Sequence, residues 1–346
     1  MNHPDLTLPD LLVNRSGQPH WGIFPGSVGH INGLQADYRS ALGEPVPRWK
    51  RRFHYKQFQY FGVISNDILI GCALADTAWL GLAFVYVFDA RSGKLQEYTW
   101  RSPLARAMQM SESPVEGESH FRQSGVDIRL GYRNDSGVLI KTLTINCKAL
   151  SVQAEMAETS PFTPMSLCTR AGINGWVYAN KVAGMPVTGQ LTLADEKMDL
   201  SALGACGHHD FSAGFMRRET FWNWACFSGR QCGNLVGINL SCGVNETSYT
   251  ENCLWLNGEL IKVDTVRFDY NRDDLMQPWR VTSIDGQVEL SFTPMGNHRE
   301  KLNVGLFAST FNQLFGQFHG VLRPAGRAAV EIRQLNGFVE EQYAKW

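Results

Sequence analysis

Two histidines and an aspartate stand side by side at His208, His209 and Asp210. A carboxylic acid buried among apolar groups has a raised pKa, which suits it to general acid or base catalysis. A metal half-site is a second interpretation, but adjacent residues of a strand face opposite ways and no third ligand stands at a suitable spacing. In a third, the aspartate and a histidine only hold a loop by hydrogen bonds. We expect the acid–base or the structural role, without a metal.

An aromatic strand follows, with the sequence Phe221-Trp222-Asn223-Trp224. Alternation places Trp222 and Trp224 on one face of the strand and Asn223 on the other. Two indoles on one face form either a wall of the core or the floor of an aromatic pocket. Core packing is the ordinary role of each tryptophan alone, and the nearby polar cluster favours the pocket for the pair.

Two adjacent arginines, Arg217 and Arg218, lie between these motifs. Guanidinium groups pair readily with carboxylates, so one of them is expected to pair with Glu219 or Asp210 while the other faces solvent. Both are therefore included among the candidate ligand-binding residues.

A second candidate cluster lies upstream, where Trp176, Tyr178 and Asn180 alternate on one face of a strand and Lys181 lies on the other. Small-molecule sites commonly combine aromatic walls with a few hydrogen-bonding groups. We expect Asn174, Trp176 and Tyr178 to bind a ligand. The alternative is that the aromatic side chains fill the core.

Strands must position these residues, because apolar and polar residues alternate along most of the chain, as in 126–132 and 236–242. Asn257-Gly258, Asp285-Gly286 and Asn336-Gly337 are typical of tight hairpin turns. Many short strands joined by such turns predict an all-β sandwich or barrel. A polar stretch without alternation predicts a domain boundary that divides the chain into 1–195 and 196–346.

The composition excludes several classes of function. The 32 basic and 33 acidic residues give no electrostatic footprint for nucleic acid. No apolar stretch is long enough for a transmembrane helix, and the N-terminus lacks a signal peptide. We therefore expect a cytoplasmic protein in which the eight cysteines stay reduced. The sequence lacks the motifs of dinucleotide-binding enzymes, P-loop NTPases, α/β-hydrolases and zinc proteases.

Four stretches of the sequence resemble a bacterial family known only as domain of unknown function 2804. The most specific stretch is 210–225, DFSAGFMRRETFWNWA, and the others are 56–93, 174–189 and 251–294. A more distant similarity reaches the carotenoid hydratase, tocopherol cyclase and AttH-like group. That resemblance implies two tandem lipocalin-like antiparallel β-barrels.

In that group, an Asp-His-x-Trp-Gly stretch precedes a Trp-Asp-Trp-like strand. The matching pieces here are Asp210 and Trp222-Asn223-Trp224, so the resemblance implies that Asp210 takes the place of the hydratase's proton donor. Here His209 precedes the aspartate instead of following it, and Phe211 replaces the polar neighbour. The activity of the hydratase therefore does not follow from the resemblance.

Two functions of one apolar pocket follow from these observations. In the first, Asp210, assisted by His209 or His208, promotes hydration or cyclisation of an isoprenoid or lipid-like substrate without a cofactor. In the second, the protein is a carrier that buries the same kind of ligand. Carbohydrate binding is a third possibility, because tryptophan-rich β proteins often stack sugars. The sequence decides neither between enzyme and carrier nor the oligomeric state.

Overall fold

The computed structural model describes residues 7–244, 249–303, 305 and 308–345. Within them, almost all regular structure is β-strand, and the strand pairs of both sheets are antiparallel. The described helices are short, namely the 3-10 turn η1 (Gly33–Gln35) and helix α1 (Arg48–His54). None of them is long and apolar enough to cross a membrane. The all-β prediction is confirmed.

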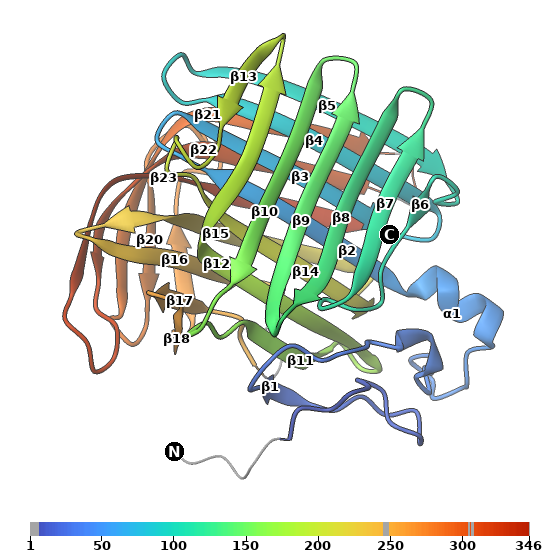
Figure 1. Cartoon of the computed structure of the whole chain (residues 1–346). Helices are drawn as coiled ribbons and strands as arrows, with labels where there is room; N and C mark the ends of the chain where they lie inside the picture. The colour runs from blue at the N-terminus through green and yellow to red at the C-terminus, as the bar shows by residue number, and fades with distance from the viewer. Residues whose placement is uncertain (1–6, 245–248, 304, 306–307, 346) are drawn as a thin grey trace.

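The first sheet forms a nearly closed barrel (Figure 1). Its main path runs in the order β5 (Lys94–Pro103), β4 (Leu80–Asp89), β3 (Ile68–Asp76), β2 (Lys56–Ile64), β14 (Cys206–Phe215), β12 (Gly175–Leu193), β10 (Leu150–Glu158), β9 (Val138–Cys147), β8 (Val126–Asp135), β7 (Gly117–Gln123) and β6 (Met108–Gln109). Off this path, β11 (Met165–Ala171) and β13 (Glu196–Asp199) pair with β12, and β1 (Gly22–Phe24) pairs with β11.

The second sheet is a half-barrel, in agreement with the predicted lipocalin-like architecture. Its order is β18 (Glu259–Lys262), β17 (Cys253–Leu256), β16 (Asn234–Cys242), β15 (Glu219–Gln231), β23 (Val330–Lys345), β22 (Ala308–Leu322), β21 (Val288–Asn303), β20 (Trp279–Ser283) and β19 (Val266–Asp269). The chain passes from one sheet to the other between β14 and β15, later than the boundary predicted at residue 195. The division into two domains stays a prediction.

The sheets are joined where β12 crosses β16. A Cβ atom on Gly237 would lie 2.4 Å from the backbone nitrogen of Gly184, so the two backbones meet without side chains between them. Ser228 of β15 fixes this crossing, because its hydroxyl accepts a hydrogen bond from the Gly184 amide and donates one to the Gly207 carbonyl, each 2.9 Å long. β12 and β14 of the first sheet are thereby held against β15 and β16.

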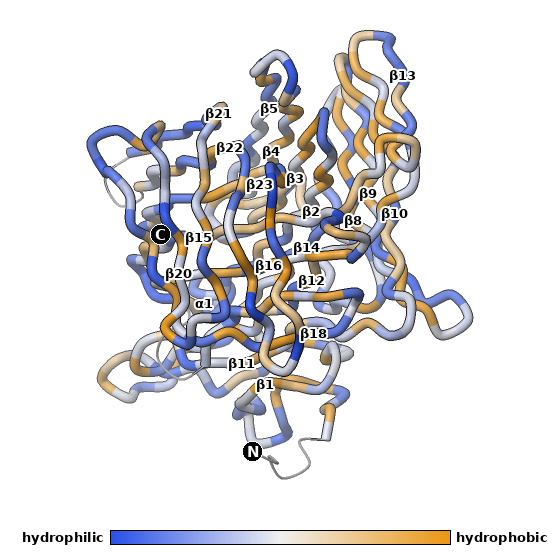
Figure 2. Tube along the Cα trace, turned by 90° about the vertical axis from the view of Figure 1, so that its left-hand side faces the viewer, coloured by the Kyte–Doolittle hydropathy of each residue, from blue (hydrophilic) through white to orange (hydrophobic). Residues whose placement is uncertain are grey.

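Apolar side chains form one cluster enclosed by the first sheet, one within the second, one between the two sheets, and one where the N-terminal segment packs on β11, β12 and β14. Figure 2 shows hydrophobic stretches along the central strands β14 and β16, whereas many peripheral connections are hydrophilic. The cluster between the sheets is rich in aromatic residues, including Tyr60, Tyr86, Trp224 and Phe338. Any polar group placed there is removed from water.

Two details of the sequence prediction had different outcomes. Asn257 and Gly258 both have positive φ values and link β17 to β18, as the turn prediction requires. The prediction of a turn at Asn336-Gly337 is wrong, because both residues lie inside β23. The Asn336 amide donates 2.9 Å hydrogen bonds to the carbonyls of Ser65 and Asn66, so tertiary contacts replace the local turn.

Candidate functional site

Asp210 lies on β14 in the space between the two sheets and forms an ion pair with Lys181. The two residues are register partners on neighbouring strands, which places both side chains on the same face. Lys181 Nζ lies 2.5 Å from Asp210 Oδ2, and both side chains are less than a tenth exposed. The Ser212 hydroxyl donates a 2.8 Å hydrogen bond to Asp210 Oδ1. The aspartate is thus held at both oxygens.

A second carboxyl group approaches the same ammonium, with Glu251 Oε1 3.5 Å from Lys181 Nζ. One cation between two carboxylates leaves a net negative charge in a buried setting, which is unfavourable. Burial raises the pKa of Asp210, against the opposing effect of Lys181. Burial also disfavours the ammonium, but Asp210 and Glu251 outweigh this and raise the pKa of Lys181. The cluster therefore combines a carboxyl group whose pKa is raised by burial with an ammonium group that opposes this shift.

Trp224 of β15 forms the aromatic wall beside this cluster. Its ring centroid lies 5.5 Å from Lys181 Nζ, within the range of a cation–π contact. Its indole nitrogen donates a 2.8 Å hydrogen bond to Asn239 Oδ1, and the Asn239 amide donates a 3.1 Å hydrogen bond to the Glu251 carbonyl. The orientation of the indole is therefore tied to the segment that carries the second carboxyl group.

His208 shares the face of Asp210 and is fully buried among aromatic rings. Its centroid lies 5.3 Å from that of Tyr60 and 5.0 Å from that of Phe338. Gly62 on β2 provides room for the imidazole, since a Cβ atom there would lie 2.0 Å from the ring. Neither ring nitrogen has a hydrogen-bond partner in the described part of the chain. Burial and the nearby Lys181 lower the pKa of His208 to about 3, so the ring is neutral.

The structure separates the two histidines, because His209 points to the opposite face of β14. There its Nε2 lies 3.0 Å from the Tyr132 hydroxyl, which donates a 2.7 Å hydrogen bond to Gln59 Oε1. Burial and the charge of Lys141 hold the pKa of His209 well below its usual value. His209 therefore belongs to the interior of the first barrel, while His208 is near Asp210.

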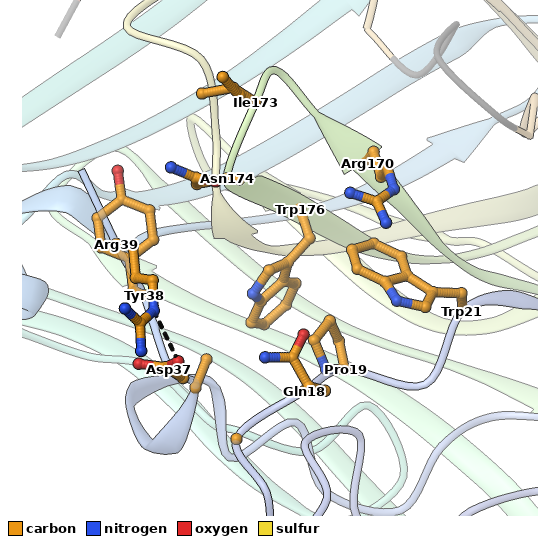
Figure 3. Close-up of a pocket in the computed structure, with 13 residues that line it drawn as sticks. Gln18, Pro19, Trp21, Asp37, Tyr38, Arg39, Arg170, Ile173, Asn174 and Trp176 are labelled. Atoms are coloured by element: carbon orange, nitrogen blue, oxygen red, sulfur yellow. Dashed lines mark hydrogen bonds and ion pairs between the residues drawn. The ribbon is translucent and has the colours of Figure 1, made fainter. Parts of the chain in front are cut away.

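Asn174, Trp176 and Tyr178 also lie away from Asp210. Asn174 and Trp176 line a pocket of about 140 Å³ between the N-terminal segment and the β11–β12 hairpin (Figure 3). The Arg170 guanidinium lies 4.9 Å from the Trp21 ring in the same pocket. Tyr178 is buried nearby, within hydrogen-bonding distance of the Ser166 hydroxyl and the Val28 amide. The predicted aromatic residues thus form two separate groups.

Of the residues predicted around β15, the tryptophans pack toward Asp210. Trp222 and Trp224 both contact the cluster between the sheets. Asn223 faces the other way and donates a 3.1 Å hydrogen bond to the Tyr270 hydroxyl. Arg217 and Arg218 are exposed on the connection between β14 and β15. The charged partner of Asp210 is therefore a lysine and not one of these arginines.

Three charged residues of the site were not among the predicted candidates: Lys181, Glu251 and Glu340. A lysine within the apolar run of β12 was a usable signal, because buried ammonium groups need carboxylate partners. Glu340 of β23 is buried and lies on the same core face as Trp224, its register partner. Nothing in the local pattern around Glu251 or Glu340 distinguishes them from exposed glutamates. No group of three or more metal-ligating side chains occurs within the described residues.

The family model for a domain of unknown function (DUF2804) matches residues 6–346. The chain belongs to this family. The match spans nearly the whole sequence and confirms the resemblance of the four sequence stretches. No curated protein matched the sequence.

Solved structures resemble this DUF2804 chain at low sequence identity. CghA with Sch210972 is 11% identical, with a TM-score of 0.57 and coverage of 98% of this chain and 97% of that one. Kievitone hydratase from Nectria haematococca is 11% identical, with a TM-score of 0.48 and coverage of 84% and 89%. A putative AttH from Nitrosomonas europaea is 12% identical, with a TM-score of 0.44 and coverage of 84% and 93%.

Proposed function

We propose that this protein binds an apolar small molecule between its two sheets and transfers a proton to or from it without a redox cofactor. The observation that carries this proposal is the buried cluster of Lys181, Asp210 and Glu251. Apolar side chains of similar volume are often as stabilising as a buried ion pair, so the cluster is hard to explain by stability alone. Buried titratable groups with shifted pKa values are typical of functional sites.

The surroundings of the cluster favour an apolar ligand. Aromatic side chains line the space between the sheets, and Phe58, Trp222 and Phe311 remain partly exposed at its border. We propose that a ligand enters between the sheets by displacing these three side chains. The unpartnered ring nitrogens of His208 would then be able to hydrogen bond to it. Lipocalin-like neighbours include a protein named as a hydratase, which agrees with small-molecule chemistry.

The cytoplasm stays part of the proposal as the place of action. All eight cysteines are unpaired, and five of them are buried. Disulfides rarely persist in the cytosol, so unpaired cysteines are the expected condition there.

The proposal is tested first by native mass spectrometry of protein purified from its own host. A co-purifying apolar molecule is expected, and all-trans-retinol serves as an isoprenoid probe for titration by tryptophan quenching. Asp210→Asn should retain ligand affinity and change the ratio of bound substrate to product. Protein that carries no apolar molecule and does not bind retinol would contradict the proposal.

A further inference from the structure

Glu340 is a third carboxyl group facing the space between the sheets. On β23 it is the register partner of Trp224 on one side and of Gln313 on the other. Only 5% of the residue is exposed. The Trp224 ring contacts Lys181, and the charges of Asp210 and Lys181 both act on Glu340. Glu340 therefore belongs to the same site.

The contacts of Glu340 contain no cation within the described residues. Trp222 Nε1 donates a 3.3 Å hydrogen bond to Glu340 Oε2, and Gln313 Nε2 donates a 2.5 Å hydrogen bond to Oε1. Gln313 Oε1 is buried without a partner. With the amide turned over, this oxygen would face Glu340 Oε1, a contact that requires a proton on the carboxyl group. As they stand, the hydrogen bonds from Trp222 and Gln313 favour the carboxylate, whereas burial without a counter-charge favours the neutral acid.

The charges around Glu340 agree with the neutral acid. Burial raises the pKa of Glu340 to about 8, although the hydrogen bonds from Trp222 and Gln313 lower it, and Asp210 contributes in the same direction as burial. Lys181 opposes the shift, but its charge is already met by Asp210 and Glu251. The titratable groups facing Glu340 from the packed strands are Tyr60, Tyr86, Lys181, His208, Asp210 and Cys226. Burial keeps the two tyrosines and Cys226 neutral by raising the pKa of each.

We propose that Glu340 is the proton donor of the site and that Asp210 is the acceptor. This inference rests on the proposed function and specifies its reaction class. Glu340 gives its carboxyl proton to a carbon–carbon double bond of the ligand. Asp210, as the carboxylate paired with Lys181, removes a proton elsewhere on the same molecule. The ligand keeps its composition, so the reaction is a redox-neutral isomerisation or cyclisation.

Two carboxyl groups in unequal surroundings suit this division of roles. Enzymes commonly keep one carboxyl group protonated and another ionised by placing the first in an apolar setting and the second beside a positive charge. After one turnover the proton resides on Asp210, and exchange with solvent returns it to Glu340. No oxidant or reductant enters the balance.

The protonation state of Glu340 can be measured without a ligand. The infrared band of a protonated carboxyl group should disappear in Glu340→Gln at pH 7, and tryptophan fluorescence should titrate with a midpoint near pH 8. Glu341→Gln is the matched control, because Glu341 accepts a hydrogen bond from Tyr270 on the other face of β23 and should leave both signals unchanged. An ionised Glu340 at pH 7 would overturn the inference.

Ligand experiments then separate this inference from the proposed function. Glu340→Gln should bind retinol with wild-type affinity while turnover of the natural ligand falls at least 100-fold, as expected for loss of a proton donor. Wild-type turnover in Glu340→Gln would overturn the donor role and leave the proposed function standing. Wild-type protein that shows the titration but binds no apolar ligand would overturn the proposed function instead.

Discussion

Lys181 and Asp210 lie opposite each other on β12 and β14, and their charged atoms are 2.5 Å apart in the space between the two sheets. The pairing depends on three structural relationships. β12 and β14 must be neighbours, their shared face must turn toward the second sheet, and Glu251 must approach from the segment before β17. Each relationship joins parts of the chain that are far apart in sequence.

Removing the buried ammonium group of Lys181 should destabilise the fold more than removing an exposed ammonium group. Lys181→Met leaves Asp210 and Glu251 buried without a cation, which is expected to cost about 3–5 kcal/mol of unfolding free energy at pH 7. Urea denaturation followed by far-ultraviolet circular dichroism measures this loss. Lys197→Met is the control, because Lys197 is exposed and its loss should change stability by less than about 0.5 kcal/mol.

Adding Asp210→Asn to Lys181→Met should restore part of the stability, because it removes one of the two uncompensated charges. Equal losses in the Lys181 and Lys197 variants would show that the buried ion pair is not present in solution.

His208 should make the fold sensitive to acid. Its folded pKa of about 3 lies below the usual value of 6.5, so the unfolded chain binds a proton that the folded chain does not. Stability is therefore fully present above pH 6.5 and falls as the pH drops toward 3, by about 1.4 kcal/mol per unit. His208→Phe keeps an aromatic ring between Tyr60 and Phe338 and should reduce this slope, measured by urea unfolding between pH 4 and pH 7.

His209→Phe provides a comparison for that measurement. It also removes a buried neutral imidazole, but it breaks the contact with the Tyr132 hydroxyl. We expect it to lower stability at pH 7, whereas His208→Phe should leave stability at that pH equal or higher. A His208→Phe protein with an unchanged acid slope would contradict a neutral His208 in the folded state.

Local alternation predicted the faces of the aromatic strand correctly. Trp222 and Trp224 share the core between the sheets, and Asn223 points away, because strand geometry alone fixes this relation. The same reasoning placed Lys181 opposite Trp176 and Tyr178, which the structure confirms, since those two side chains belong to another cluster. What alternation does not supply is which strand pairs with which.

The order of the strands in the sheets explains why the grouping of the site residues could not be predicted from the sequence. Asp210 lies in the middle of the first sheet, between β2 and β12, although it follows the predicted domain boundary. The grouping of Asp210 with Trp224 and Glu340 arises only when the two sheets face each other. Asn174 and Trp176 were assigned to the same pocket as Asp210 from chemistry alone, yet they line a separate cavity. Their role in binding stays a prediction.

The crossing of the two sheets should not tolerate a methyl group. Gly237→Ala would place a Cβ atom 2.4 Å from the Gly184 nitrogen and 2.5 Å from the Ala183 carbonyl carbon. Both are backbone atoms, so neither can rotate away. We expect the free energy of unfolding to fall by about 2–4 kcal/mol, as is typical of strong overpacking. Gly233→Ala is unsuitable as a control because its φ is positive. Ser241→Ala on the same strand is the control, because it tests whether any substitution in β16 causes a comparable loss of stability.

A melting temperature of Gly237→Ala within one degree of the wild type would show that the strands separate readily. In that case the site between the sheets would be less rigid than the structure indicates. Ser228→Ala should give a smaller loss of about 1 kcal/mol, because it removes two hydrogen bonds but no backbone contact.

Asp210 and Trp224 variants separate an enzyme from a carrier. Asp210→Asn preserves the shape of the side chain and should lower turnover by two or more orders of magnitude while ligand affinity changes little. Trp224→Ala removes aromatic area and should weaken binding in either case, at a cost of about 3–5 kcal/mol in stability. Folding of both variants must therefore be checked by circular dichroism first. Unchanged turnover in Asp210→Asn would exclude this residue from proton transfer.

Glu340 should produce the opposite pH dependence from His208. Its folded pKa of about 8 lies above the usual 4.5, so the folded chain keeps a proton that the unfolded chain has released. Stability is therefore greatest below pH 4.5 and falls as the pH rises toward 8, by about 1.4 kcal/mol per unit from this group. Glu340→Gln cannot ionise and should lose this contribution, so its stability relative to the wild type should increase steadily from pH 5 to pH 8 in urea unfolding. Glu341→Gln should follow the wild-type curve, and a Glu340→Gln curve parallel to it would mean that Glu340 is ionised in the fold.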